Sequence, residues 1–243
     1  MKNGAWHGSV VAVKCYGEDK WSGEAMEKKY SSLSGRWCGR CGRSIFLTVL
    51  LAGMILTACT KGGAKLAPLP ADAVVLAFGD SITYGTGASL EESYPAVLGR
   101  LTGKTVINAG VPGEVTAEGL ARLPGELDRY RPALLLLCLG GNDFLRRLDE
   151  RQAADNIREM VRLARGKGVD VVLIGVPQLG LAPSPPPFYR QVARELDVPY
   201  EGDVLKRILT KKSLKADFIH PNAQGYKVFA EGVAVLMKEC GAL

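Results

Sequence analysis

The sequence predicts an α/β protein with a parallel sheet covered by helices on both faces. Between residues 73 and 239, short apolar runs alternate with amphipathic stretches of 8 to 18 residues. Strands that alternate with helices of this length imply right-handed crossovers and therefore parallel strands. The composition fits a protein with a substantial core, because 47% of the residues are hydrophobic and 23% are charged.

The predicted strands are short apolar runs that end in Gly, Asp or Asn. The run 133–139 is apolar throughout, as expected for a central strand buried on both faces. In chain order, the five predicted strands are residues 73–78, 105–108, 133–139, 169–175 and 198–200.

The predicted helices lie between these strands and show apolar positions at helical spacing. Residues 116–130 place Leu120, Leu123 and Leu127 on one face, and Pro124 is expected to kink or split this helix. In chain order, the main predicted helices are residues 94–101, 116–130, 152–165, 188–196 and 222–239.

Charge is distributed unevenly along the 243 residues. Residues 1–65 carry ten Lys and Arg against four Asp and Glu, whereas residues 66–243 carry 21 of each. Because the globular part has no basic excess, a nucleic-acid-binding domain is not expected. No apolar run reaches 18 residues, which excludes a polytopic membrane protein.

The N-terminal segment is typical of an export signal. Three arginines precede an apolar run over residues 45–58, which is too short to cross a bilayer. The following sequence, Leu56-Thr57-Ala58-Cys59, resembles the lipobox of bacterial lipoproteins. The resemblance implies a lipid attached to Cys59 and a place on the periplasmic face of a bacterial membrane. An ordinary secretory signal and a signal anchor are the alternatives.

Three segments follow from this interpretation: an extension and export signal over residues 1–58, a lipidated cysteine with its tether over residues 59–70, and a domain over residues 71–243. Thr60, rather than Asp, follows Cys59, which favours the outer membrane. A signal that begins at Met26 has ordinary length, so whether residues 1–25 are translated stays open.

The six cysteines do not indicate a metal site. Cys38 and Cys41 have CxxC spacing, but no second pair of ligands lies nearby. Both belong to the segment that is expected to be removed. Of the cysteines that remain, Cys59 is expected to carry lipid, and no structural disulfide is predicted between Cys138 and Cys240.

Polar residues gather at the predicted strand ends, where parallel sheets place their sites. Three short blocks follow predicted strands, and a fourth lies in the last loop. They are Gly79-Asp80-Ser81, Gly113 within residues 108–113, Gly140-Gly141-Asn142-Asp143, and Asp217-Phe218-Ile219-His220-Pro221-Asn222.

In order and separation, these four blocks resemble those of the SGNH (GDSL-type) hydrolase superfamily. The resemblance covers about residues 72–240 and is nearest to the branch of bacterial arylesterases, acyl-thioesterases and lysophospholipases. It implies a three-layer α/β/α sandwich with a flavodoxin-like, five-stranded parallel sheet.

The residue types in these blocks suit acyl transfer. Ser81 is the candidate nucleophile, and His220, the only histidine outside the N-terminal extension, is its candidate base. Asp217, three residues earlier, is placed to orient the imidazole. The resemblance implies an oxyanion hole made by the N–H groups of Ser81 and Gly113 and the side-chain amide of Asn142.

Each of these residues also has a structural interpretation. Ser81 and Asn142 are common helix N-caps, and Gly113 suits a turn. His220 and Asp217 are also compatible with a purely structural loop. Asp80 and Asp143 are interpreted as structural, with Asp80 organising its turn and Asp143 pairing locally.

Substrate preference is less clearly encoded. Phe144 and Leu145 follow Asn142. Pro177 lies in the proline-rich loop 176–187, which follows the fourth predicted strand and is expected to overhang the site. These three residues are expected to bind an acyl chain, with core packing as the alternative for Phe144 and Leu145. Arg146 and Arg147 suit either an anionic head group or a solvated face.

The sequence therefore predicts a serine esterase that hydrolyses short or medium acyl esters, thioesters or lysophospholipids through an acyl-enzyme. No metal or organic cofactor is implied, and a monomer is expected. One alternative is a carbohydrate O-deacetylase that uses the same residues. A second is a lipoprotein that binds lipid or glycan without turnover.

Overall fold

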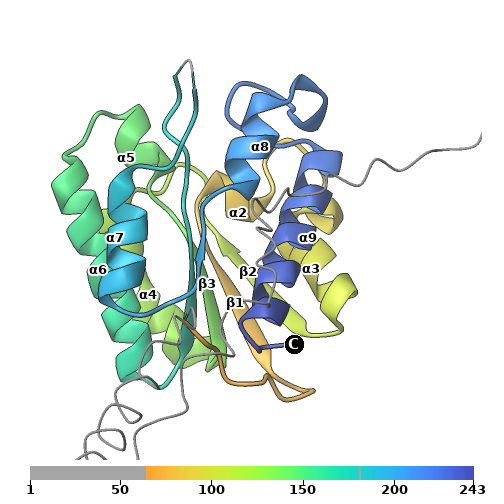
Figure 1. The fold of residues 1–243 in the computed structure, drawn as a ribbon, viewed down its shortest axis with the longest axis vertical. Coiled ribbons are helices and arrows are strands. Elements are labelled where there is room, and N and C mark those ends of the chain that lie inside the picture. The colour runs from red at the N-terminus through yellow and green to blue at the C-terminus, as the bar shows by residue number, and fades with distance from the viewer. Residues whose placement is uncertain (1–63, 181) are drawn as a thin grey trace, which may run out of the picture. The chain divides into compact units, whose positions relative to one another are not determined.

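A computed structural model of the chain describes residues 64–180 and 182–243 (Figure 1). The predicted export signal, the Cys38–Cys41 pair and the candidate lipidation site Cys59 lie outside these residues. Among the residues described, no helix is both long enough and apolar enough to span a bilayer.

The centre of the molecule is a five-stranded parallel sheet with the strand order β2-β1-β3-β4-β5. This is the flavodoxin-like order, and it confirms the predicted fold class. Each strand lies within two residues of its predicted position. The strands are β1 (Val74–Gly79), β2 (Thr105–Gly110), β3 (Leu134–Cys138), β4 (Asp170–Ile174) and β5 (Tyr200–Glu201).

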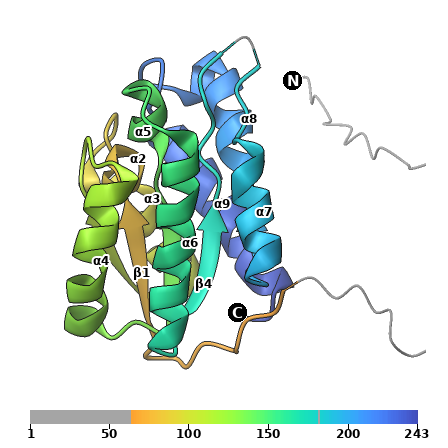
Figure 2. The ribbon, with the colours of Figure 1, turned by 90° about the vertical axis from the view of Figure 1, so that its left-hand side faces the viewer.

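Helices cover both faces of this sheet (Figures 1 and 2). One face carries α3 (Tyr94–Thr102) and α9 (Ala223–Glu239), and the other carries α4 (Thr116–Tyr130), α6 (Glu150–Gly166) and α7 (Pro187–Glu195). Helix α4 runs unbroken through Pro124, so the predicted split does not occur. Leu123 and Leu127, on either side of Pro124, are both buried in the core and hold the helix against the sheet.

Short helices that the sequence pattern did not predict lie at the edge of the sheet where the strands end. They are α2 (Ser81–Tyr84), α5 (Gly141–Leu145) and α8 (Val204–Thr210), with 3₁₀ turns at Leu90–Glu92 and Lys212–Leu214. Elements of four to seven residues are too short to show a helical period. Helix α2 begins two residues after the end of β1, and α5 begins three residues after the end of β3, so these helices carry residues that follow those strands.

The core is continuous across the sheet. All five residues of β3 are fully buried, which agrees with its uninterrupted apolar sequence. The N-terminal end of the described chain joins this core, since Leu66 is buried and its N–H donates to the Cys240 carbonyl. This contact lies in the stretch that the sequence assigned to the tether.

Candidate active site

Ser81, His220 and Asp217 form a continuous hydrogen-bonded chain at the carboxyl edge of the sheet. The Ser81 Oγ lies 3.0 Å from the His220 Nε2, and the His220 Nδ1 lies 2.7 Å from the Asp217 Oδ2. Ser81 is the first residue of α2 and lies two positions after the end of β1, whereas the other two residues share the loop before α9. The fold thus joins residues that are 139 positions apart in the sequence.

The loop around Asp217 is folded on its own side chain. The Asp217 Oδ1 accepts the backbone N–H groups of Ile219 and His220, each at 2.8 Å, which leaves the Oδ2 for the imidazole. Partial burial by itself raises the pKa of Asp217. The hydrogen bonds from the His220 ring and from the two backbone N–H groups outweigh burial and hold this pKa below its ordinary value. Asp217 is therefore a stable negative partner for an imidazolium.

Asn142 lies beside the serine, in the first turn of α5. Its Nδ2 donates to the Glu114 carbonyl at 3.0 Å and lies 3.5 Å from the Asp80 Oδ2. Ser81 and Asn142 line the same cavity. The Asp80 side chain accepts the backbone N–H of Ile82 rather than that of Ser81. Among the described residues, no group accepts the Ser81 N–H.

Gly113 occupies the loop between β2 and α4, next to Glu114. Its φ of +83° is in the left-handed region that favours glycine. No acceptor for its N–H is found within residues 64–180 and 182–243, while its carbonyl accepts from the Arg146 guanidinium at 2.7 Å. Gly113 does not line the cavity that holds Ser81, so its place in an oxyanion hole rests on the motif resemblance.

The two neighbouring aspartates are buried and structural, but in different ways. Asp80 caps α2, as expected, and burial raises its pKa to about 7 despite the Ile82 N–H and His220, which both favour the charged form. Asp143 does not pair locally, contrary to the prediction. Its two oxygens accept from the N–H and the hydroxyl of Thr116, 27 residues away. The first backbone N–H groups of α4 have no partner within the helix, and they face the buried turn of α5.

A cavity of about 180 Å³ opens beside Ser81 and His220. The predicted substrate-binding residues Phe144, Leu145 and Pro177 all line it. Most of the remaining wall is also apolar. Val176 and Leu179 belong to the loop 176–187 that was expected to overhang the site, whereas Ile82, Leu209 and Ile219 were not predicted. The sequence could have indicated Ile219, since it lies inside the block that contains His220. It could not have indicated Leu209, because that residue belongs to the unpredicted helix α8.

A serine, an imidazole and a carboxylate in series, beside amide donors and an apolar cavity, suit attack on an acyl carbonyl. Within residues 64–180 and 182–243, no three His, Cys, Asp or Glu side chains are grouped so as to hold a metal ion.

Comparison with known proteins agrees with this chemistry. A profile of the GDSL-like Lipase/Acylhydrolase family matches residues 77–228. An arylesterase of Vibrio mimicus is 30% identical over 197 residues, which cover 76% of this chain and 96% of the relative. The thioesterase 1/protease 1/lysophospholipase L1 of Escherichia coli K12 is 29% identical over 171 residues, covering 66% and 81% of the two chains.

A solved structure shares both sequence and fold with this chain. The SGNH-hydrolase family esterase AlinE4 is 30% identical with a TM-score of 0.54, and the match covers 69% of this chain and 96% of that one. The matched region makes up almost all of the AlinE4 chain. The chain is an esterase of SGNH fold and belongs to the GDSL-like lipase/acylhydrolase family.

Proposed function

We propose that Ser81, His220 and Asp217 are the catalytic triad of this esterase and that it works through an acyl-enzyme. The observation that carries the proposal is the hydrogen-bonded series from the Ser81 Oγ through the imidazole to the Asp217 carboxylate, with distances of 3.0 and 2.7 Å. In this series the Ser81 hydroxyl donates to the Nε2, and the Nδ1–H donates to Asp217.

Acylation follows from this arrangement. The Ser81 Oγ attacks the acyl carbon while the His220 Nε2 takes its proton, and Asp217 stabilises the imidazolium that forms. The oxyanion accepts from the Ser81 N–H, the Gly113 N–H and the Asn142 amide. Collapse of the tetrahedral intermediate breaks the bond to the alcohol or thiol, which leaves with the proton from His220.

Deacylation repeats these steps with water. His220 takes a proton from the water that attacks the acyl carbon and returns it to the Ser81 Oγ as the acid leaves. The same donors stabilise the second oxyanion, so the free enzyme is regenerated without a cofactor.

The proposed substrates are short or medium acyl esters, thioesters or lysophospholipids. The apolar wall beside Ser81 supports an acyl chain in the cavity. The names of the relatives, an arylesterase and a thioesterase/lysophospholipase, support the same range.

The nucleophile is tested by hydrolysis of p-nitrophenyl esters from acetyl to dodecanoyl. Ser81→Ala is expected to lower kcat by about 10³-fold or more and to abolish labelling by a fluorophosphonate, because the alanine variant has no attacking oxygen. Ser213→Ala, at an exposed serine, is the matched control and should keep wild-type rates.

The chain-length profile tests the substrate class. A maximum at butyryl to octanoyl esters supports the proposal, whereas turnover of acetyl esters alone supports the O-deacetylase alternative. A folded wild-type protein that neither hydrolyses esters nor reacts with the fluorophosphonate would support a binding lipoprotein instead.

We also propose that the protein is exported and anchored by a lipid on Cys59 to the periplasmic face of a bacterial membrane. Of the two membranes, the outer membrane is favoured. The basic, apolar and Cys59 segments of the sequence support this. Labelling of the full chain with radioactive palmitate in a bacterial host tests it. Cys59→Ser should lose the label, Cys41→Ser should keep it, and an unlabelled wild-type chain would contradict lipidation.

A further inference from the structure

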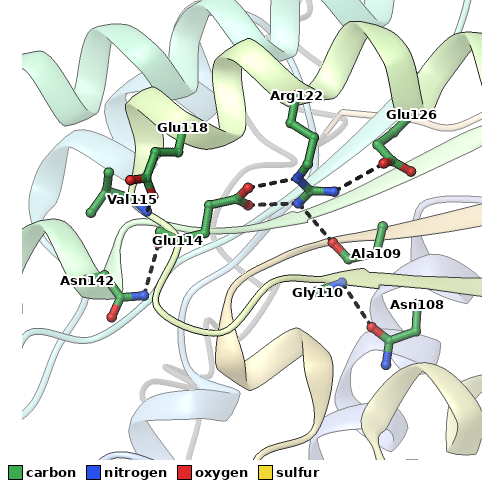
Figure 3. Close-up of polar contacts among 9 residues, drawn as sticks. All are labelled: Asn108, Ala109, Gly110, Glu114, Val115, Glu118, Arg122, Glu126 and Asn142. Carbon is green, nitrogen blue, oxygen red and sulfur yellow. Dashed lines mark hydrogen bonds and ion pairs between the residues drawn. The ribbon is translucent and has the colours of Figure 1, made fainter.

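Arg122 and Glu114 form a bidentate ion pair beside the candidate active site (Figure 3). The Nε and Nη2 of Arg122 donate to the Oε1 and Oε2 of Glu114 at 2.7 and 2.8 Å. Glu114 is only 5% exposed. A carboxylate buried this deeply needs its partner, since an unpaired charge in such a place is strongly unfavourable.

Arg122 also fixes the start of the loop that ends at Glu114. Its Nη2 donates to the Ala109 carbonyl in β2 at 3.0 Å, and its guanidinium lies 4.0 Å from the centre of the Phe78 ring in β1. One side chain of α4 therefore holds both ends of the segment 109–114, as Figure 3 shows. We refer to the Arg122–Glu114 pair, with its bond to Ala109, as the clasp.

The held segment carries two parts of the proposed oxyanion hole. Gly113 lies within it, and the Glu114 carbonyl accepts one hydrogen of the Asn142 amide at 3.0 Å. The two hydrogens of a planar amide have a fixed angle between them. The bond to Glu114 therefore fixes the direction of the second hydrogen, which makes only a long contact of 3.5 Å with the Asp80 Oδ2 and is the one that an oxyanion would accept.

We propose that Arg122 is a positioning residue for catalysis, acting through Glu114 to align the Gly113 N–H and the Asn142 amide with the oxyanion. This inference rests on the proposed function and assigns a role to a side chain that does not line the substrate cavity.

Loss of the clasp should reduce turnover rather than substrate binding. Without Arg122, the buried Glu114 carboxylate must reach water, and the movement takes the loop with it. Donors aimed at the oxyanion act mainly in the transition state, so their misalignment lowers kcat. Substrate is held by the apolar cavity, which the clasp does not form, so KM should change little.

The test measures kcat and KM of Arg122→Ala and Arg122→Lys in the full chain, with Arg129→Ala as the control. For Arg122→Ala we expect kcat to fall by about 10²-fold with KM within about twofold. Lysine cannot make two parallel bonds to a carboxylate, so the kcat of Arg122→Lys should lie between those of the wild type and Arg122→Ala. Arg129 lies on the same helix but is exposed, so its replacement should keep the wild-type kcat.

Two readouts separate positioning from general destabilisation. Guanidinium at millimolar, non-denaturing concentration should restore part of the kcat of Arg122→Ala but none of the loss in Arg122→Lys. In the background of Asn142→Ala, the loss caused by Arg122→Lys should shrink several-fold, because one of the aligned donors is already missing.

The proposal is overturned by an unchanged kcat in Arg122→Lys and Arg122→Ala, by a loss confined to KM, or by equal losses with and without Asn142. If Arg122→Ala does not fold, Arg122→Lys and Glu114→Gln decide on the same criteria. An active Ser81→Ala variant would instead contradict the proposed triad, so the two failures are distinguishable.

Discussion

Asp80 shows how burial changes a side chain next to the active site. It is 2% exposed, its Oδ1 caps α2, and burial raises its pKa to about 7 from an ordinary value of 3.8. The nearby Glu114 and Asp143 raise this pKa further, while the Ile82 N–H and His220 oppose the rise. Between pH 4 and 7 the folded protein thus keeps a proton on Asp80 that the unfolded chain releases.

This difference predicts a pH-dependent stability. Because the folded state binds the extra proton, the contribution of Asp80 to stability is full below about pH 4 and is lost as the pH rises to about 7. Asp80→Asn cannot lose a proton and keeps the oxygen that caps α2. Urea unfolding should give similar free energies for wild type and Asp80→Asn at pH 4, and a gain on the order of 4 kcal/mol for the variant at pH 8. A difference that does not change with pH would contradict the raised pKa.

At the scale of elements, the position of α2 depends on two glycines at the ends of β1 and β2. Gly79 and Gly110 are paired in the sheet. A Cβ on Gly110 would lie 2.1 Å from the backbone nitrogen of Tyr84, and one on Gly79 would lie 2.4 Å from the Thr83 Oγ1, and both of these atoms belong to α2. Both glycines therefore allow α2, which begins with Ser81, to pack directly on strand backbone.

Gly110→Ala is expected to push α2 away from β2. The added methyl group meets backbone, which cannot turn aside as a side chain can, so we expect a loss of about 1–3 kcal/mol in unfolding free energy and lower esterase activity. Gly125→Ala is the matched control. No heavy atom outside its own helix lies within 4 Å of that added methyl group, and alanine favours a helix, so stability should rise by about 0.5–1 kcal/mol. Chemical denaturation of both variants checks the pair, and equal effects would contradict the packing argument.

At the scale of the whole molecule, the beginning and end of the described chain are joined at the edge opposite the active site. The N–H groups of Leu66 and Leu69 donate to the carbonyls of Cys240 and Ala242, and Ala67 donates to the Asp170 side chain in β4. Figure 2 shows this edge below the sheet, with α5 and α8 at the other end. The described part of the chain therefore begins at the end of the domain that does not carry Ser81.

The same contacts predict where the folded unit begins. Residues 64–243 should fold and hydrolyse esters like the full chain. Residues 71–243 lose the buried Leu66 and its backbone bonds, about 2–3 kcal/mol, which corresponds to a Tm lower by about 5–10 °C. Thermal unfolding of the two segments measures this difference, and equal Tm values would show that residues 64–70 contribute nothing.

Much of the fold follows from local pattern. Each strand was predicted within two residues, because a short apolar run between Gly, Asp and Asn has few alternatives to a buried strand. Phe144, Leu145 and Pro177 line the cavity beside Ser81, since residues that follow strand ends reach the same edge of the sheet. The clasp was not predicted, because nothing in the sequence distinguishes Arg122 from the other charged residues of α4.

The sequence by itself determined the α/β class, the candidate Ser81, Asp217 and His220, and the division between a basic extension and a neutral domain, since these depend on residue type and local order. The tertiary structure alone decided that Asp143 binds Thr116, that Leu209 lines the cavity, and that Arg122 holds the loop of Gly113 and Glu114. These contacts join segments that no local pattern relates, and they exist only once the parallel sheet brings its strand ends together.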